Sequence, residues 1–279
     1  MKIEKYSRPF TYFGLTLGVS WILWFIMAGI SHSDLWDIQI WKIFGSILGL
    51  LGLSAPMVVA FALILPDRDM RNELKNATFS FKGFNKSWFA FIILFPFVML
   101  FLSQTVSLLF GHNTDQFKLA GEFSFSAGIF PVWLLFLIVP LLEEFGWRTY
   151  GTHCIRRKIN VFYTSLIFGV IWAIWHIPLS FVNGYYHSNV AETGLLYSIN
   201  YSVSLIPYLI FDSWVYYKTK RNMLIQFIMH LVFNFSMEMF RTHEDSKVIY
   251  TGLFIIFCTI IILKDKKFFF DKTFVDGEE

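Results

Sequence analysis

Two adjacent carboxylates, Glu143 and Glu144, lie inside an apolar stretch that is long enough to cross a membrane. One charge near the centre of a bilayer costs about 2.5–3.5 kcal/mol, so two neighbouring acids there need a reason. Three more polar side chains with catalytic chemistry, His176, His230 and Asn234, also fall within apolar segments. Residues in such positions typically line a cavity, a proton path or a catalytic site.

The segment around the two acids, Leu141–Arg148, is expected to be helical, because only a helix satisfies its own backbone within lipid. Glu144 and Arg148 are four residues apart, so they share a helix face and are expected to pair. Glu143 points about 100° away from Glu144, which leaves it available as a general base. Pro140 is expected to distort the helix beside the acids. The structural alternative is a charged cluster that reaches water at the helix end.

The other three polar residues form two further patterns. His176 lies one turn after Trp172 on the same helix face, and Pro178 is expected to disturb the helix just beyond it. His230 and Asn234 are four residues apart and also share a face. Their spacing suits two metal ligands or two donors to an oxyanion. Hydrogen bonding between helices is the structural alternative for both patterns.

The composition predicts a membrane protein that crosses the bilayer many times, because 56% of the 279 residues are hydrophobic and only 15% are charged. A spanning helix needs about 20 apolar residues. We predict an all-α polytopic fold with eight transmembrane helices, roughly at Thr11–Ile30, Trp41–Leu65, Trp88–Phe110, Gly128–Trp147, Phe162–Val182, Leu196–Tyr217, Asn222–Met239 and Val248–Leu263.

Lysine and arginine concentrate in alternate connections, at the N-terminus and around residues 68–86, 156–158, 218–221 and 264–272. Basic connections stay in the cytoplasm, so both termini are predicted to be cytoplasmic. The net charge of +3 therefore reflects topology, and no clustered basic and aromatic surface indicates nucleic-acid binding. We predict a single transmembrane domain over residues 1–279, with the polar stretch Asp67–Ser87 as a connection.

Three motifs follow one another on separate predicted helices: Glu-Glu-x3-Arg at Glu143–Arg148, aromatic-x3-His at Trp172–His176, and His-x3-Asn at His230–Asn234. In this order they resemble the CPBP (ABI) family of CAAX proteases and bacteriocin-processing enzymes, which includes the type II CAAX prenyl endopeptidases. The motif-bearing core covers residues 128–240 approximately, and the family's eight-helix architecture would extend over nearly the whole chain. Trp172 departs from the phenylalanine usual in the family but keeps an aromatic ring.

The resemblance implies an intramembrane endopeptidase that hydrolyses a peptide bond with a glutamate-activated water. Glu143, assisted by His176, would deprotonate the water, and His230 and Asn234 would donate hydrogen bonds to the oxyanion. Glu144 and Arg148 would orient Glu143. We predict that no metal is used, because Asn234 is a poor zinc ligand. The alternative is a zinc ion held by Glu143, His176 and His230.

Two other functions are consistent with the same residues. An ion-coupled transporter relays protons through acids and histidines, but it is expected to show two related halves, which this sequence lacks. A noncatalytic membrane scaffold of the same family is expected to have lost motif residues, whereas all six are present. The sequence leaves the substrate open between a prenylated CAAX protein and a bacteriocin or other peptide precursor. The expected location is a cell membrane, and the composition favours a prokaryotic source.

Overall fold

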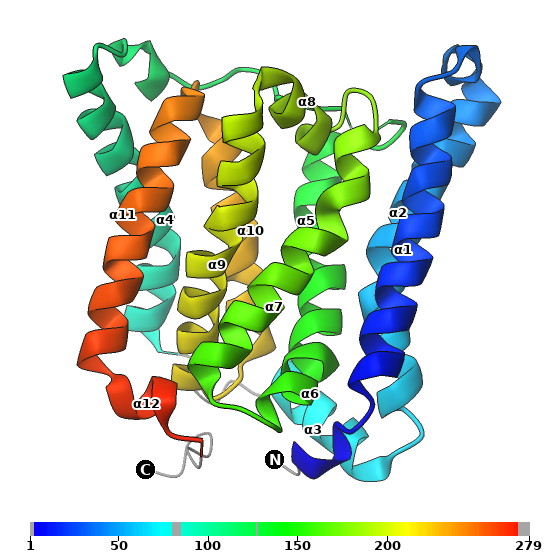
Figure 1. Cartoon of the computed structure of the whole chain (residues 1–279), viewed down its shortest axis with the longest axis vertical. Coiled ribbons are helices and arrows are strands. Elements are labelled where there is room, and N and C mark those ends of the chain that lie inside the picture. Colours follow the sequence, from blue (N-terminus) through cyan, green and yellow to red (C-terminus); the bar gives the residue numbers. More distant parts are fainter. Residues whose placement is uncertain (1–2, 80–84, 127, 273–279) are drawn as a thin grey trace. The chain divides into compact units, whose positions relative to one another are not determined.

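The computed structural model of the chain describes residues 3–79, 85–126 and 128–272. Over these residues it is built from α-helices, and the only strand-like pairing is an isolated antiparallel bridge between Leu119 and Phe240. The helices are α1 (Pro9–Ser31), α2 (Gln39–Ile64), α3 (Arg68–Phe79), α4 (Lys86–Ser107), α5 (Val132–Gly146), α6 (Thr152–Arg156), α7 (Val161–His176), α8 (Tyr186–Thr193), α9 (Leu195–Lys218), α10 (Met223–Met239), α11 (Glu244–Lys264) and α12 (Lys266–Phe270) (Figure 1).

Helices occupy all eight segments in which we predicted a membrane span. Five helical segments are long and apolar enough to cross a bilayer, namely those that begin at Pro9, Gln39, Lys86, Val161 and Glu244. The helix Met223–Met239 is apolar but shorter. The all-α polytopic membrane fold is confirmed, while the count of eight spans and the cytoplasmic termini stay predictions.

Part of the Asp67–Ser87 connection is helical. Residues Arg68–Phe79 form the helix α3. Lys5 Nζ forms ion pairs with Asp67 Oδ1, just before α3, and with Asp69 Oδ2, in α3, each at 2.8 Å. The charged residues of this connection therefore anchor the start of the chain to the end of α2.

The chain divides into two compact units. Unit 1 comprises Met1–Leu74, Ser124–Lys158 and Ile171–Ser198, and unit 2 comprises Lys75–Phe123, Ile159–Val170 and Ile199–Glu279. Each unit is described separately below. The single membrane domain over residues 1–279 stays a prediction.

Unit 1 is organised around α2, which packs against α1 on one side and α5 on another (Figure 1). Buried hydrogen bonds join α1 to α2: Ser20 Oγ donates to the Gly52 carbonyl at 2.8 Å, and Trp24 Nε1 donates to the Gly49 carbonyl at 3.0 Å. Trp175, at the end of α7, donates from its indole N–H to Ser20 Oγ at 2.8 Å. These bonds fix the end of α7 relative to α1 and α2.

The approach of α5 to α2 depends on Gly146, because its backbone lies directly against that of Pro56. A Cβ at position 146 would overlap carbon atoms of Pro56 and would lie 2.6 Å from Met57 N. The two helices would have to separate, since backbone atoms cannot turn aside as a flexible side chain can.

Gly146→Ala is therefore expected to lower the free energy of unfolding by about 1–3 kcal/mol, the usual cost of overpacking. Gly18→Ala in α1 is the matched control, because nothing lies within 4 Å of a Cβ there. In the control, alanine is expected to leave stability unchanged or raise it by about 0.5–1 kcal/mol. The measurement is denaturant unfolding in detergent micelles, and equal stability of the two variants would contradict the close packing.

Unit 2 has an aromatic core built on α4, which packs against α10 and α11. The rings of Phe95 and Phe211 stack with centroids 4.6 Å apart, and Phe233 of α10 lies 5.8 Å from Phe254 of α11. These large rings bury much apolar area in a small set of contacts. They hold α10, which carries two of the predicted site residues.

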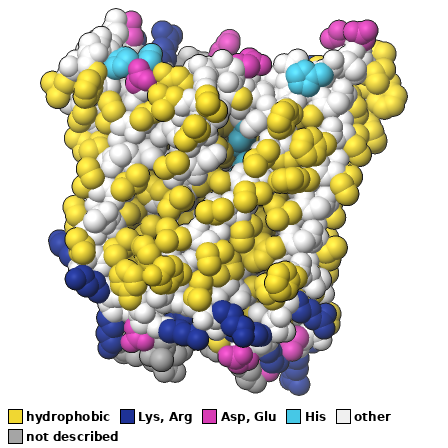
Figure 2. Space-filling view, in the orientation of Figure 1, with side chains coloured by type: hydrophobic (Ala, Val, Ile, Leu, Met, Phe, Trp, Pro, Cys, Tyr) yellow, Lys and Arg dark blue, Asp and Glu magenta, His cyan; other side chains and the backbone are white. Residues whose placement is uncertain are grey.

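The surfaces of both units carry the apolar side chains expected to face lipid. Ile22 and Val58 in unit 1 are 63% and 56% exposed, and Leu94 and Ile256 in unit 2 are 59% and 58% exposed. Figure 2 shows such side chains (yellow) along the helices of the face drawn. Apolar exposure on this scale indicates a membrane surface.

Candidate active site

Glu143 and Glu144 lie near the C-terminal end of α5, where both side chains are only 2% exposed. They are buried in protein, so they do not form a charged cluster that reaches water at a helix end. Pro140 lies inside α5, which continues through it, and a π-helix at Trp147–Gly151 follows directly. Single π-helical turns are frequent at functional sites.

Glu144 pairs with Arg148, as the four-residue spacing predicts. Arg148 Nε lies 3.4 Å from Glu144 Oε2, with the two side chains 1% and 3% exposed. Arg148 also contacts Thr152, at 3.5 Å between Nη1 and Oγ1. The pair therefore holds two opposite charges inside unit 1 and fixes the direction in which Glu144 points.

Glu143 faces a different set of neighbours. The Trp172 indole lies beside its carboxylate. One carboxylate oxygen, Oε2, is buried and has no hydrogen-bond partner among the residues that the structure describes. A buried polar atom without a hydrogen bond lowers the stability of the fold unless a ligand or a water molecule serves as its partner. Glu143 is thus the acid of the pair that is suited to bind a further molecule.

His176 is the last residue of α7, and Pro178 lies in the 3₁₀ turn Ile177–Phe181 that follows it. This confirms the predicted distortion, because Pro178 has no N–H with which to continue the helix. His176 Nδ1 lies 2.8 Å from the Trp172 carbonyl oxygen, which can only accept. Nδ1 therefore carries the proton, and in the neutral ring Nε2 carries the lone pair.

Two aromatic residues that the sequence analysis did not select complete the surroundings of His176. The His187 ring stacks on that of His176, with centroids 4.9 Å apart and planes at 18°, and Tyr185 stacks on His187 at 5.6 Å. Tyr185 is in turn within electrostatic reach of Glu143. Trp172 lies beside Glu143, and its ring centroid is 5.6 Å from that of His176, so Trp172 links the two residues.

The charge states of these two aromatic residues follow from their surroundings. Desolvation, and next the neighbouring His176, hold the pKa of His187 well below its usual value. Desolvation, and next the Glu143 carboxylate, raise the pKa of Tyr185. Both side chains are therefore neutral near pH 7, and His187 stacks on His176 without repelling it. In the sequence, the feature that could have identified His187 is its position directly after two tyrosines, Tyr185 and Tyr186.

The remaining predicted residues lie in unit 2. His230 is 4% exposed on α10, its ring lies 5.8 Å from that of Tyr208, and Asn234 follows one turn later on the same helix. The start of α10 is capped by Asn222, whose side chain accepts from Ile225 N at 3.1 Å. The structure thus brings Glu143, Glu144, Arg148 and His176 together in unit 1, and places His230 and Asn234 together on α10.

Comparison with known proteins connects these residues to a family. Residues 125–236 match the family model described as Rce1-like type II CAAX prenyl endopeptidase, and this range contains all six predicted site residues. The chain is 34% identical over 272 residues to CAAX prenyl protease 2 of Methanococcus maripaludis. The aligned region covers 96% of this chain and 97% of that protein.

Two more distant relatives cover only part of this chain. Lysostaphin resistance protein A of Staphylococcus haemolyticus is 25% identical over 151 residues, which is 53% of this chain and 39% of that protein. The protein of the same name from Staphylococcus aureus is 24% identical over 155 residues, which is 54% of this chain and 34% of that protein.

Proposed function

The chain belongs to the family of type II CAAX prenyl endopeptidases, and from that membership we propose how its residues hydrolyse a peptide bond within the membrane. Members of this family are peptidases, so the chain is a multi-pass intramembrane endopeptidase. The observation that carries the proposed mechanism is the buried Glu143 Oε2, which has no hydrogen-bond partner among the described residues. The Glu143 carboxylate lies beside Trp172, which also contacts His176.

In the proposed reaction, Glu143 and the lone pair on His176 Nε2 hold one water. Glu143 takes a proton from the water as its oxygen forms a bond to the scissile carbonyl carbon. The carbonyl oxygen becomes an oxyanion. When the C–N bond breaks, protonated Glu143 gives its proton to the leaving amine, and the carboxylate is restored. Serine and cysteine nucleophiles are not required, so no acyl-enzyme forms.

His230 and Asn234 are proposed to donate hydrogen bonds to the oxyanion. This part of the proposal rests on the two residue types and their spacing of one turn on α10. Each donor of this kind contributes about 10²–10³ in rate in other hydrolases.

We propose that this chemistry proceeds without a bound metal. Glu143, His176 and His230 are all residue types that bind zinc, but the amide of Asn234 suits a hydrogen-bond donor far better than a zinc ligand. Peptide cleavage is therefore expected to continue at its full rate after stringent chelation, with the remaining metal measured by elemental analysis. Loss of cleavage that zinc restores would instead assign a zinc ion to these three residues.

We propose that the substrate carries a C-terminal isoprenoid. The support is the match to a CAAX prenyl protease along 97% of that protein, compared with partial matches to the lysostaphin resistance proteins. The test is a cleavage assay with purified protein in bilayers, using one CAAX peptide with and without its prenyl group. At least about tenfold faster cleavage of the prenylated form is expected, equivalent to about 1.4 kcal/mol. Equal rates would favour a bacteriocin or other peptide precursor.

A further inference from the structure

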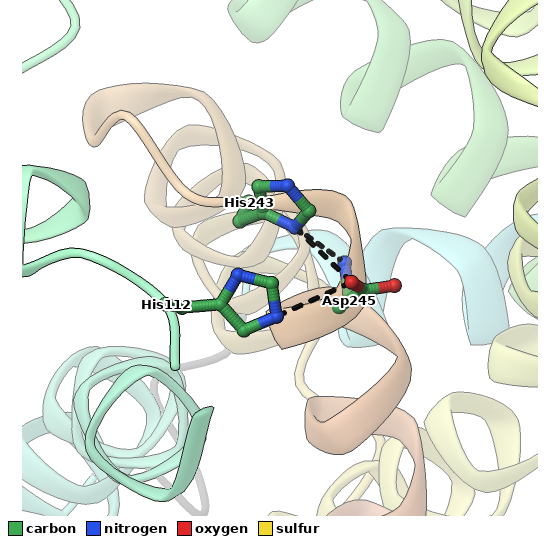
Figure 3. Close-up of side chains that lie close together, drawn as sticks. All are labelled: His112, His243 and Asp245. Carbon is green, nitrogen blue, oxygen red and sulfur yellow. Dashed lines mark hydrogen bonds and ion pairs between the residues drawn. The ribbon is translucent and has the colours of Figure 1, made fainter. Parts of the chain in front are cut away.

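A second cluster of ligating side chains lies in unit 2, and none of its members is among the residues assigned to hydrolysis. It consists of His112, in the connection after α4, and His243 and Asp245, at the start of α11 (Figure 3). The ligand atoms of the three residues all lie within 4.8 Å of one another. His112 Nε2 is 3.2 Å from Asp245 Oδ2, and His243 Nδ1 is 3.5 Å from the same oxygen. We name these three residues the His–His–Asp cluster.

The two segments that supply the cluster are held together by buried amide side chains. Gln116 Nε2 donates to Ser107 Oγ at 2.8 Å, and Ser246 Oγ donates to Gln116 Oε1 at 2.7 Å. Gln104 Nε2 donates to Thr242 Oγ1 at 2.8 Å. Gln104, Gln116, Ser107 and Ser246 are all at most 4% exposed. The positions of the ligands are therefore set by a rigid network and not by the chance meeting of two surface loops.

The separation of Asp245 Oδ2 from each histidine nitrogen suits one shared metal ion. Tetrahedral zinc with bonds of about 2.0–2.2 Å holds its donors about 3.3–3.6 Å apart, close to the two measured separations of 3.2 and 3.5 Å. His243 Nδ1 now accepts the Asp245 backbone N–H at 3.2 Å, so it carries a lone pair. Metal binding would exchange that hydrogen bond for a coordinate bond. The side chains of His112, His243 and Asp245 are 20%, 52% and 41% exposed, which gives an ion access from water.

We propose that the His–His–Asp cluster binds one zinc ion, with water in the fourth position. The ion joins the connection after α4 to the start of α11. Between these segments, Arg241 N donates to the Lys118 carbonyl at 3.0 Å, and Ala120 N donates to the carbonyl of Met239, the last residue of α10, also at 3.0 Å. Zinc at this position would therefore fix the end of α10. This role is structural and does not depend on the proposed hydrolytic mechanism.

The test is a calorimetric titration of the chelated full-length protein in micelles with zinc chloride. The wild type is expected to bind one zinc per chain and to unfold at a higher temperature when zinc is present, because the ligand binds only the folded state. Replacing zinc by cobalt(II) is expected to give the visible absorption of a tetrahedral site. His112→Ala and Asp245→Asn are each expected to weaken zinc binding at least about tenfold.

Two further variants test whether zinc binds at the cluster or at another histidine. His243→Asn keeps a side chain able to cap α11 and is expected to lose zinc binding without losing the helix. His32→Gln, at the C-cap of α1 in unit 1, is the control and is expected to bind zinc as the wild type does. Absence of saturable zinc binding by the wild type would overturn the proposal. So would undiminished binding in His112→Ala and Asp245→Asn, because the ion would then lie elsewhere.

Discussion

Glu143→Gln is expected to reduce peptide cleavage by about 10²–10⁴-fold, the usual contribution of a general base. Glutamine has nearly the same shape as glutamate but cannot take a proton from water. The fold is expected to survive, because the change removes one of two adjacent negative charges, each only 2% exposed. The loss should appear in kcat, since the proton is transferred only in the chemical step.

The measurement for Glu143→Gln is single-turnover cleavage of a prenylated CAAX peptide, together with the thermal unfolding midpoint of the same preparation. Glu192→Gln, on the short helix α8, is the control for loss of a carboxylate elsewhere in unit 1 and is expected to cleave normally. Unchanged cleavage by Glu143→Gln would rule out the proposed mechanism. Lost cleavage with an unchanged unfolding midpoint would distinguish a catalytic defect from a structural one.

Glu144→Gln is expected to act mainly on stability, with a loss of about 3–5 kcal/mol in the free energy of unfolding. Its carboxylate faces the Arg148 guanidinium at 3.4 Å, and both side chains are at most 3% exposed. Removing one partner leaves the other charge buried without its counter-charge, which costs more than the pair itself contributes. Cleavage per folded molecule is expected to fall less than in Glu143→Gln, because Glu144 orients its neighbour and takes no proton.

A double-mutant cycle tests this pairing. Arg148→Met alone is expected to be as harmful as Glu144→Gln, whereas the double variant is expected to recover much of the loss, because no unpaired charge remains. Lys5→Met is the comparison for an exposed pair, since Lys5 and Asp67 are 31% and 34% exposed. It is expected to cost far less, because water screens such pairs. Additive losses in the cycle would show that Glu144 and Arg148 do not act as a pair.

The sequence alone was sufficient to predict the class of fold and the ion pair between Glu144 and Arg148. Long apolar segments require helices within lipid, and a polar residue there is costly enough to be noticed. The spacing of four residues placed Glu144 and Arg148 on one face, and their ion pair in the structure agrees with that prediction. The roles of Glu143, His176, His230 and Asn234 stay predictions that rest on residue type, spacing and family.

Helical periodicity describes only residues within a few turns of one another, so contacts between distant segments had to come from the tertiary structure. Packing decided that His187 stacks on His176 and that Gly146 lies against Pro56. The tautomer of His176, by contrast, follows from a local contact, because the carbonyl of Trp172, one helical turn earlier, can only accept a hydrogen bond.

The His–His–Asp cluster shows the same limit most clearly. His112 and Asp245 are far apart in the sequence, and neither lies in a recognisable ligand motif. Tertiary contacts, among them the buried hydrogen bond between Ser246 and Gln116, bring the two side chains to 3.2 Å. The sequence therefore determined which residues are costly to bury in a membrane, while the folded chain decided which of them meet, because side-chain contacts across helices depend on packing and not on local spacing.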